Sequence, residues 1–148
     1  MSVPNCIFCN KKNCKIIQTL NYFFVLRDTS YPVTMHHTLI VTKRHIESFF
    51  DLTVDETIEL HEILKQQKNE LENIDKTISS FNVGVNDGED AGQSIKHCHI
   101  HLIPRRKGDV EDPQGGVRGV IPSKQKYVKK KIIFLEILFL LFLVGLCF

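Results

Sequence analysis

Within residues 92–103, polar and apolar side chains alternate from His97 to Leu102, and this pattern predicts a β-strand with two unlike faces. Successive side chains of a strand point to opposite faces, so His97, His99 and His101 would line one face. The apolar residues between them would face the core, and Pro104 would end the apolar run. The sequence therefore predicts a row of three imidazoles beside a buried surface.

Shorter β-branched and aromatic runs predict further strands at residues 16–17, 22–26, 38–42 and 81–86. One amphipathic helix follows Thr53, which can serve as its N-cap while Glu56 closes a capping box. Its expected inner face consists of Leu60, Ile63, Leu64, Leu71 and Ile74. About ten residues join the last two strands, which favours an antiparallel pair with a functional loop between them.

Length and composition indicate one domain with a tail. The chain has 148 residues, 43% of them hydrophobic and 24% charged, as in ordinary globular proteins. A formal net charge of +2 does not point to nucleic acid, and we expect no nucleic-acid partner. The polar N-terminus does not resemble a signal peptide, so a cytoplasmic protein is expected.

Five cysteines without a signal peptide favour metal binding or free thiols over a disulfide framework. Cys6 and Cys9 form a Cys-x-x-Cys hook that can hold two corners of a tetrahedral zinc site. Cys14 is either a further ligand or an incidental thiol. The remaining ligands of such a site would have to be histidines.

The loop at residues 86–94 is polar and contains glycine, and it directly precedes the histidines. Imidazoles beside backbone and hydroxyl donors suit an anionic, phosphorylated substrate. Two alternatives are structural histidines and a metal site made of histidine alone. Residues 105–107 are basic, which indicates either a solvated surface or contact with a polyphosphate chain.

The C-terminus differs in composition from the rest of the chain. Residues 132–148 are apolar except for Glu136 and follow three lysines, Lys129 to Lys131. As a helix they would measure about 25 Å, just short of a bilayer core. We therefore divide the chain into a domain, residues 1–127, and a tail, residues 128–148, that is a membrane anchor, a core or interface helix, or an extension without function.

Seven consecutive residues resemble the signature of the histidine triad (HIT) superfamily: His97-Cys98-His99-Ile100-His101-Leu102-Ile103. The likeness extends over about residues 5–127. Residues 86–96 are similar to the Fhit branch, residues 6–9 to the N-terminal hook of many prokaryotic members, and residues 115–122 to the C-terminal segment of bacterial HIT hydrolases. The resemblance implies an α+β fold, with a mainly antiparallel sheet and one long helix, that pairs as a homodimer.

The resemblance also implies chemistry at the α-phosphorus of a nucleotide. His99 would be the nucleophile that forms a nucleotidyl-histidine intermediate, which water then cleaves. The backbone carbonyl of His97 would hold the far ring nitrogen of His99, and His101 would contact a phosphoryl or bridging oxygen. Neutral imidazole is a good nucleophile, and its phosphorus adduct is labile, which agrees with these roles.

Further site residues are carried over from the family's pattern. Gln93 and Ser94 match residues that contact the phosphate and the leaving group, and Asn86 matches a polar residue of the nucleotide site. His37 matches a buried histidine that supports the triad. Asp28 falls where the family places a side chain on the ribose hydroxyls.

In relatives with the hook, zinc is held by the two cysteines and two histidines. The matching residues here are Cys6, Cys9, His45 and His97, which would form a closed, structural site that catalysis does not require. One departure concerns the residues before His37. Many members have Pro-Gly there, whereas this chain has Met35-His36, and His36 would adopt glycine's tight backbone less freely.

The leading functional hypothesis is a hydrolase of dinucleoside polyphosphates, such as diadenosine tetraphosphate. A Hint-type nucleoside phosphoramidase or a nucleotidyl transferase would use the same triad. Two hypotheses outside catalysis are a nucleotide-binding signalling protein and a purely metal-binding module.

Overall fold

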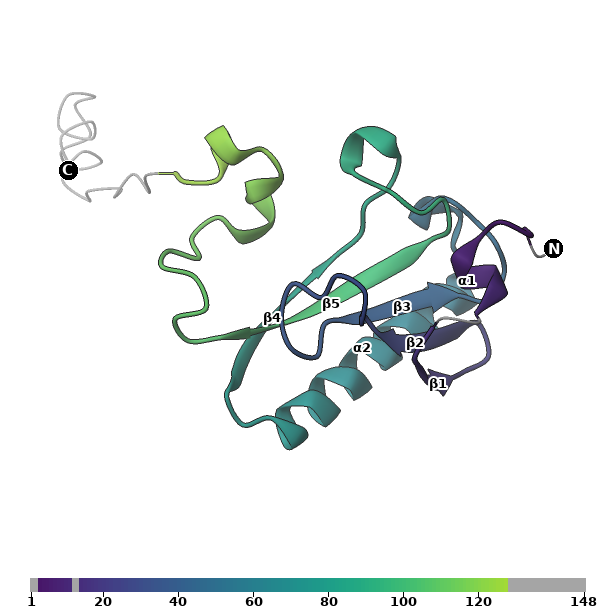
Figure 1. Cartoon of the computed structure of the whole chain (residues 1–148), viewed down its shortest axis with the longest axis horizontal. Coiled ribbons are helices and arrows are strands. Elements are labelled where there is room, and N and C mark those ends of the chain that lie inside the picture. The colour runs from purple at the N-terminus through teal and green to yellow at the C-terminus, as the bar shows by residue number, and fades with distance from the viewer. Residues whose placement is uncertain (1–2, 12–13, 128–148) are drawn as a thin grey trace, which may run out of the picture. The chain divides into compact units, whose positions relative to one another are not determined.

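The computed structural model describes residues 3–11 and 14–127 (Figure 1). The chain divides into two compact units, residues 1–113 and 114–148. The first contains all the strands and both α-helices of the described residues. The expected α+β fold is confirmed.

One five-stranded antiparallel sheet forms the first unit, in the order β1-β2-β3-β5-β4. The strands are β1 (Ile16–Thr19), β2 (Phe23–Arg27), β3 (Thr38–Thr42), β4 (Ile78–Gly84) and β5 (His99–Arg106). β2 and β3 are buried almost throughout, which explains their unbroken apolar and β-branched runs. The histidine strand β5 lies between β3 and β4, so its backbone is hydrogen-bonded along both edges.

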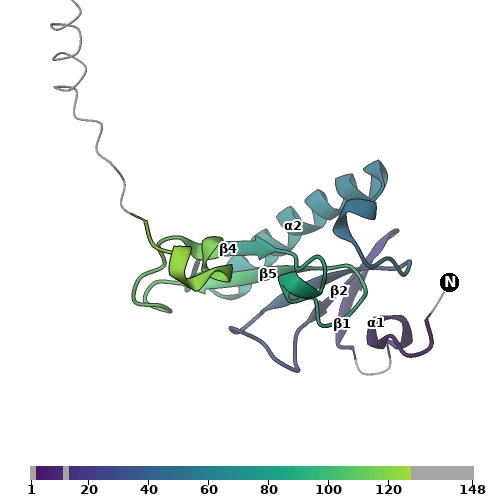
Figure 2. The same ribbon diagram turned by 90° about the horizontal axis from the view of Figure 1, so that it is seen from above.

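Helix α2 (Val54–Ile74) covers one face of the sheet (Figure 2). Thr53 and Glu56 form the expected capping box, in which each side chain accepts a hydrogen bond from the other residue's backbone N–H. Leu60 and Ile63 pack with Ile100 and other inward residues of the strands. The sequence pattern placed Ile74 on this face as well, but Ile74 is exposed at the last turn.

The opposite face carries the N-terminal hook, where the short helix α1 (Ile7–Asn10) lies (Figure 2). Phe8 packs there with Phe24 and Val41 in a second buried cluster. The register pairs Val41 with His99, so the histidines share this face with the hook. Strand β5 therefore directs apolar side chains toward α2 on one face and imidazoles toward the hook on the other.

The second unit begins at Gln114 and contains two short 3₁₀ helices, η3 (Gly116–Val120) and η4 (Pro122–Lys124). Gly115 has a φ of 83°, and a Cβ there would lie 2.0 Å from the carbonyl oxygen of Gln125. Only glycine fits this turn. Arg118 donates to the Lys124 carbonyl and lies 5.3 Å from the ring of Tyr127.

In the part of the chain that the structure describes, no helix is long and apolar enough to cross a bilayer. The tail at residues 128–148 lies outside the described residues. Its expected role as an anchor and the expected domain boundary after residue 127 therefore stay predictions.

Candidate active site and metal-binding cluster

Five histidines form a row, made of two groups of contacting rings, on the side of the sheet opposite α2. Adjacent ring centroids are 4.8 Å apart for His45 and His97, 5.2 Å for His99 and His101, and 5.2 Å for His101 and His37. The ring of Phe8 lies edge-on to both His97 and His99 and links the two parts of the row. Sequence alternation placed three of these imidazoles together, and the tertiary structure adds one at each end.

His99 stands at the centre of the row and is 6% exposed. Its Nδ1 lies 2.7 Å from the backbone carbonyl of His97, a contact that requires a hydrogen on Nδ1. Nε2 then carries the lone pair. Burial lowers the pKa of His99, so the ring is neutral at neutral pH. This tautomer and charge state make Nε2 a nucleophile, as the resemblance implied.

His101 and His37 form the end of the row nearest the start of β3. His37 Nε2 and His101 Nδ1 are 3.0 Å apart, and the two rings are stacked. Burial, with the neighbouring His99 and His37, lowers the pKa of His101 to about 4. His101 Nε2 is buried and has no hydrogen-bond partner among residues 3–11 and 14–127. A buried nitrogen of this kind is a candidate contact for an oxygen of a ligand.

Asp28 supports His37 instead of standing alone at the surface. Its Oδ2 lies 3.3 Å from His37 Nδ1, and its Oδ1 accepts hydrogen bonds from the backbone of Ser30 and Tyr31. The predicted contact of Asp28 with ribose remains a proposal. The contact with His37 was not expected, because sequence spacing alone gives no sign of it.

The other end of the row is a cluster of two thiols and two imidazoles: Cys6, Cys9, His45 and His97. Their ligand atoms all lie within 4.8 Å of one another. His97 Nδ1 is 3.3 Å from Cys6 Sγ and 3.7 Å from Cys9 Sγ, while His45 Nδ1 is 3.4 Å from Cys9 Sγ. Sulfur and nitrogen ligands of one tetrahedral zinc ion would be roughly 3.5 Å apart, so these residues fit a metal.

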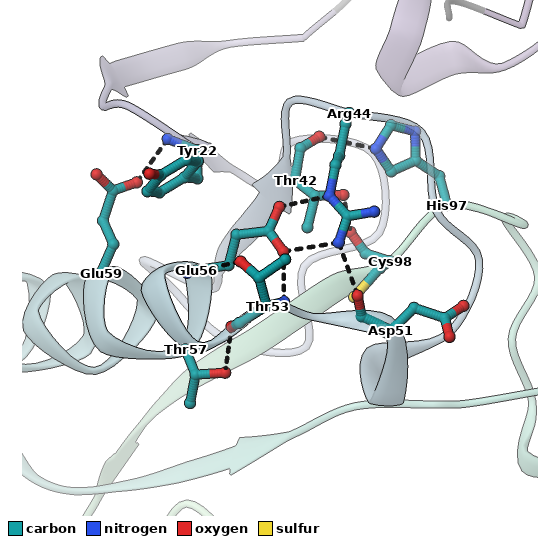
Figure 3. Close-up of polar contacts among 10 residues, drawn as sticks. All are labelled: Tyr22, Thr42, Arg44, Asp51, Thr53, Glu56, Thr57, Glu59, His97 and Cys98. Carbon is teal, nitrogen blue, oxygen red and sulfur yellow. Dashed lines mark hydrogen bonds and ion pairs between the residues drawn. The ribbon is translucent and has the colours of Figure 1, made fainter.

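The far nitrogen of His97 is also held in place. Nε2 lies 2.8 Å from the backbone carbonyl of Thr42, to which it donates its hydrogen (Figure 3). Nδ1 is therefore left with a lone pair that faces the thiols. Next to this contact, Arg44 pairs with the buried carboxylate of Glu56 and lowers its pKa to about 2 (Figure 3). That pair anchors the turn after β3 to the start of α2.

His97 itself differs from the simple strand prediction. β5 begins at His99, so His97 precedes the strand, and its ring is directed at the hook. Its backbone carbonyl nevertheless orients His99. One residue thus joins the metal-binding cluster to the candidate nucleophile. The contributions of Phe8 and of the Thr42 carbonyl were missed, because apolar and backbone groups leave no motif.

The loop before the histidines is held by its own side chains. Gln93 accepts from the backbone of Gly88 and donates to the carbonyl of Glu47. Asp87 accepts from the hydroxyl of Ser48 and the backbone N–H of Phe49. The amide of Gln93 therefore shapes the loop, and its contact with a phosphate remains a proposal.

The other two loop residues in the predicted site lie at the ends of this segment. Asn86 is half-buried where β4 leads into the loop, and Ser94 is exposed just before the histidines. Their predicted contacts with substrate stay predictions.

Arg105 and Arg106, the last two residues of β5, pair with other side chains of the chain. Arg105 pairs with Asp109 through two nitrogens and also donates to Asn82. Arg106 pairs with Asp75 and donates to Thr34 and Thr77. Both guanidinium groups are therefore engaged within the chain, which neither the solvated surface nor the contact with a polyphosphate anticipated.

Comparison with protein families decides the family. The model of the HIT domain matches residues 10–108. The chain belongs to the HIT family. Relatives include the bifunctional bis(5'-adenosyl)-triphosphatase/adenylylsulfatase FHIT of Arabidopsis thaliana, 34% identical over 101 residues, which cover 68% of this chain and 55% of the relative. The asymmetrical bis(5'-nucleosyl)-tetraphosphatase of Schizosaccharomyces pombe is 33% identical over 81 residues, 55% of this chain and 44% of the relative.

This HIT chain thus spans about half the length of these two relatives, both named as hydrolases. Among solved structures, a zinc-bound histidine triad family protein from Mycobacterium smegmatis is similar with a TM-score of 0.64. It is 26% identical, and the match covers 71% of this chain and 78% of that one. The Cys-x-x-Cys hook agrees with the placement of Cys6 and Cys9 beside His97.

Proposed function

We propose that this HIT protein hydrolyses dinucleoside polyphosphates, such as diadenosine tetraphosphate, through a nucleotidyl-histidine intermediate on His99. The observation that carries the proposal is the hydrogen bond from His99 Nδ1 to the His97 carbonyl, which leaves a lone pair on Nε2 of a neutral, buried ring. The substrate class is supported by the names of relatives that share the domain.

In the first step, Nε2 of His99 attacks the α-phosphorus and the bond to the leaving oxygen breaks. His101, once protonated on Nε2, is suited to contact that oxygen through this nitrogen, which has no partner among the described residues, and to deliver the proton to it. In the second step, water attacks the same phosphorus, the bond from Nε2 to phosphorus breaks, and the water's proton passes to His101. Both histidines then return to their starting states.

The remaining site residues have supporting roles in this proposal. Gln93 and Ser94 bind phosphate oxygens, and Asn86 lines the nucleoside site. The hook binds zinc through Cys6, Cys9, His45 and His97, and the ion supplies structural cross-linking when bound. His97 would then be fixed by the metal on one ring nitrogen and by Thr42 on the other.

Two further expectations accompany the enzyme proposal. A homodimer is expected from the resemblance, and Phe50, Val54 and Ile58, exposed apolar residues four apart around the start of α2, offer a surface for a second copy. A cytoplasmic location and the association of the tail with a membrane stay predictions.

The test is mass spectrometry of the protein quenched during turnover of diadenosine tetraphosphate. A mass increase of one nucleotidyl group on the peptide that contains His99, absent in His99→Asn, is the expected result. Turnover of the substrate with no adduct at early times would overturn the covalent mechanism. An adenosine phosphoramidate assayed beside it separates the hydrolase from the Hint-type alternative, and binding without turnover of either would indicate a signalling protein.

A further inference from the structure

Three titratable side chains lie in line behind the candidate active site: Asp28, His37 and His101. They come from the end of β2, the residue before β3, and the middle of β5. Asp28 Oδ2 is 3.3 Å from His37 Nδ1, and His37 Nε2 is 3.0 Å from His101 Nδ1. The chain of contacts ends at His101 Nε2, which is buried without a partner among the described residues.

The carboxylate is oriented by contacts other than His37. Oδ1 of Asp28 accepts from the backbone N–H of Ser30 at 3.0 Å and of Tyr31 at 3.1 Å. The backbone N–H of Asp28 donates to the His37 carbonyl at 2.9 Å, next to the last register pair of β2 and β3. The second carboxylate oxygen is therefore aimed at an imidazole that is itself 3% exposed.

Two hydrogen arrangements fit these distances. If the carboxylate accepts the Nδ1 hydrogen of His37, then His37 Nε2 accepts from His101 Nδ1, and His101 Nε2 is a lone pair that can take up a proton. If instead the backbone N–H of Val33 donates to His37 Nδ1 at 3.4 Å, the hydrogen of His37 lies on Nε2 and is donated to His101 Nδ1. The hydrogen of His101 then lies on Nε2. His101 Nε2–H is then a fixed donor, and His101 cannot gain a proton without losing its contact to His37.

We propose that Asp28 is a positioning residue, which through His37 sets the tautomer of His101 and enables that imidazole to carry a proton to and from the leaving group. The inference rests on the proposed function of His99 and His101. Asp28 Oδ2 contacts His37 Nδ1 as an ion pair at 3.3 Å, while the Val33 N–H hydrogen-bonds to the same nitrogen at 3.4 Å. A charged carboxylate at this distance repels a lone pair on Nδ1 and attracts a hydrogen there, which favours the first arrangement. The arrangement resembles the way a buried carboxylate orients a catalytic imidazole in other hydrolases.

The charges around His101 agree with this role. His99 and His37 disfavour a proton on His101, while Asp28 favours it. Burial lowers the pKa of His37, and Asp28 again acts in the opposite direction. Asp28 thus stabilises the protonated form of both imidazoles, and His101 needs that form to transfer a proton.

The substitution Asp28→Asn is a sharp test because it keeps the shape of the side chain. Its carbonyl oxygen can still accept from Ser30 and Tyr31, while its amide N–H would point at His37 Nδ1 and impose the second arrangement. Glu62→Gln, which removes a carboxylate from the exposed face of α2, is the matched control.

The kinetic readout uses aryl esters of adenosine 5'-monophosphate whose leaving phenols have increasing pKa. All carry the same nucleoside, so loss of a ribose contact would lower kcat/KM equally along the series. Loss of proton delivery should instead leave a nitrophenyl ester within about 3-fold of wild type while an unsubstituted phenyl ester falls by about 10²-fold. A uniform loss, or none, would overturn the proposal.

A spectroscopic readout is independent of turnover. Nitrogen NMR of histidine-labelled, unliganded protein should place the hydrogen of His101 on Nδ1 in the wild type and on Nε2 in Asp28→Asn. The same tautomer in both proteins would overturn the relay even if His99 forms its adduct. Absence of that adduct in wild type with the expected tautomer change would instead reject the proposed function and leave the relay standing.

Discussion

The two ends of the imidazole row are built from the same kind of side chain and differ in the partners of their ring nitrogens. At the hook end, His97 has a carbonyl on Nε2 and thiols at Nδ1. At the far end, His101 has only His37 on Nδ1, and its Nε2 is unpartnered among the residues described. The hook end therefore suits a fixed metal ligand, and the far end suits a group that exchanges a proton.

His99 lies between these ends and depends on both. Its tautomer is set by the carbonyl of His97, and its ring is flanked by His101. The chemistry of each imidazole here therefore depends on the group that holds its second nitrogen. Substitutions at the centre and at either end of the row test this dependence.

Replacing the central histidine should have the largest effect. His99→Asn removes the lone pair that attacks phosphorus, and hydrolysis should fall by about 10³-fold or more. Steady-state assays with diadenosine tetraphosphate check this, and nucleotide binding measured by calorimetry should persist. A variant that keeps more than a tenth of the activity would show that His99 is not the nucleophile.

Removal of one thiol from the Cys-x-x-Cys hook should weaken zinc binding at Cys6, Cys9, His45 and His97. Cys9→Ser removes a thiolate ligand, and zinc affinity should fall by at least about 10²-fold, since loss of even a hydrogen-bond partner of a metal ligand costs about 10–100-fold. Metal titration with a competing chromophoric chelator measures the loss, and chelation should lower the Tm of wild type but not of the variant. Cys14→Ser is the control, because Cys14 lies outside the four-residue cluster. Equal zinc affinity in all three proteins would reject the site.

Acidification should lower the stability of the folded protein through His37 and His101, which lie at the end of the row away from the hook. Burial lowers the folded-state pKa of His37 and His101, the latter to about 4, while unfolded histidine titrates near 6.5. The unfolded chain then binds more protons below pH 6.5, so stability is full above that pH and is lost as pH falls toward 4. His101 alone should account for about 3 kcal/mol of this loss, measured by urea unfolding at several pH values. His101→Asn should flatten the dependence, whereas substitution of the exposed His61 by Asn should not.

The smallest expected effect concerns the loop that leads into His37. His36 has a φ of 68°, the left-handed conformation that favours glycine. His36→Gly should raise the free energy of unfolding by about 0.5–1 kcal/mol, because relief of strain outweighs the added freedom of the unfolded chain. Urea unfolding measures this gain, and His36→Ala, which keeps a Cβ, should show none.

Much of the fold was predictable because its signals are local. Alternation along β5 separated Cys98 and Ile100, which are buried under α2, from His99 and His101 on the other face. The capping box at Thr53 placed the start of α2 correctly. Many family members have glycine where this chain has His36, and His36 does adopt the left-handed conformation that glycine favours. The family's pattern therefore predicted the backbone conformation at this position.

Contacts between distant segments were harder to predict. Residues 28 and 37 were each expected in the site, but their contact with one another depends on the register of β2 with β3. Arg106 looked available for phosphate until folding brought Asp75, the residue after α2, to its guanidinium group. Spacing along a chain does not reveal such partners, since hydrogen bonds and ion pairs depend on the third dimension.

Local patterns were enough to predict the motif, the long helix, the hook and the row of three histidines, because residue type and periodicity act over a few neighbours. The family resemblance implied separate roles for these imidazoles, and the contacts that support the roles come from the tertiary structure. Folding turns His97 toward the thiols, gives His99 a backbone acceptor, and buries Nε2 of His101 while His37, beside Asp28, contacts its Nδ1. An imidazole has two nitrogens, so the partner that folding brings to one of them decides what the other can do.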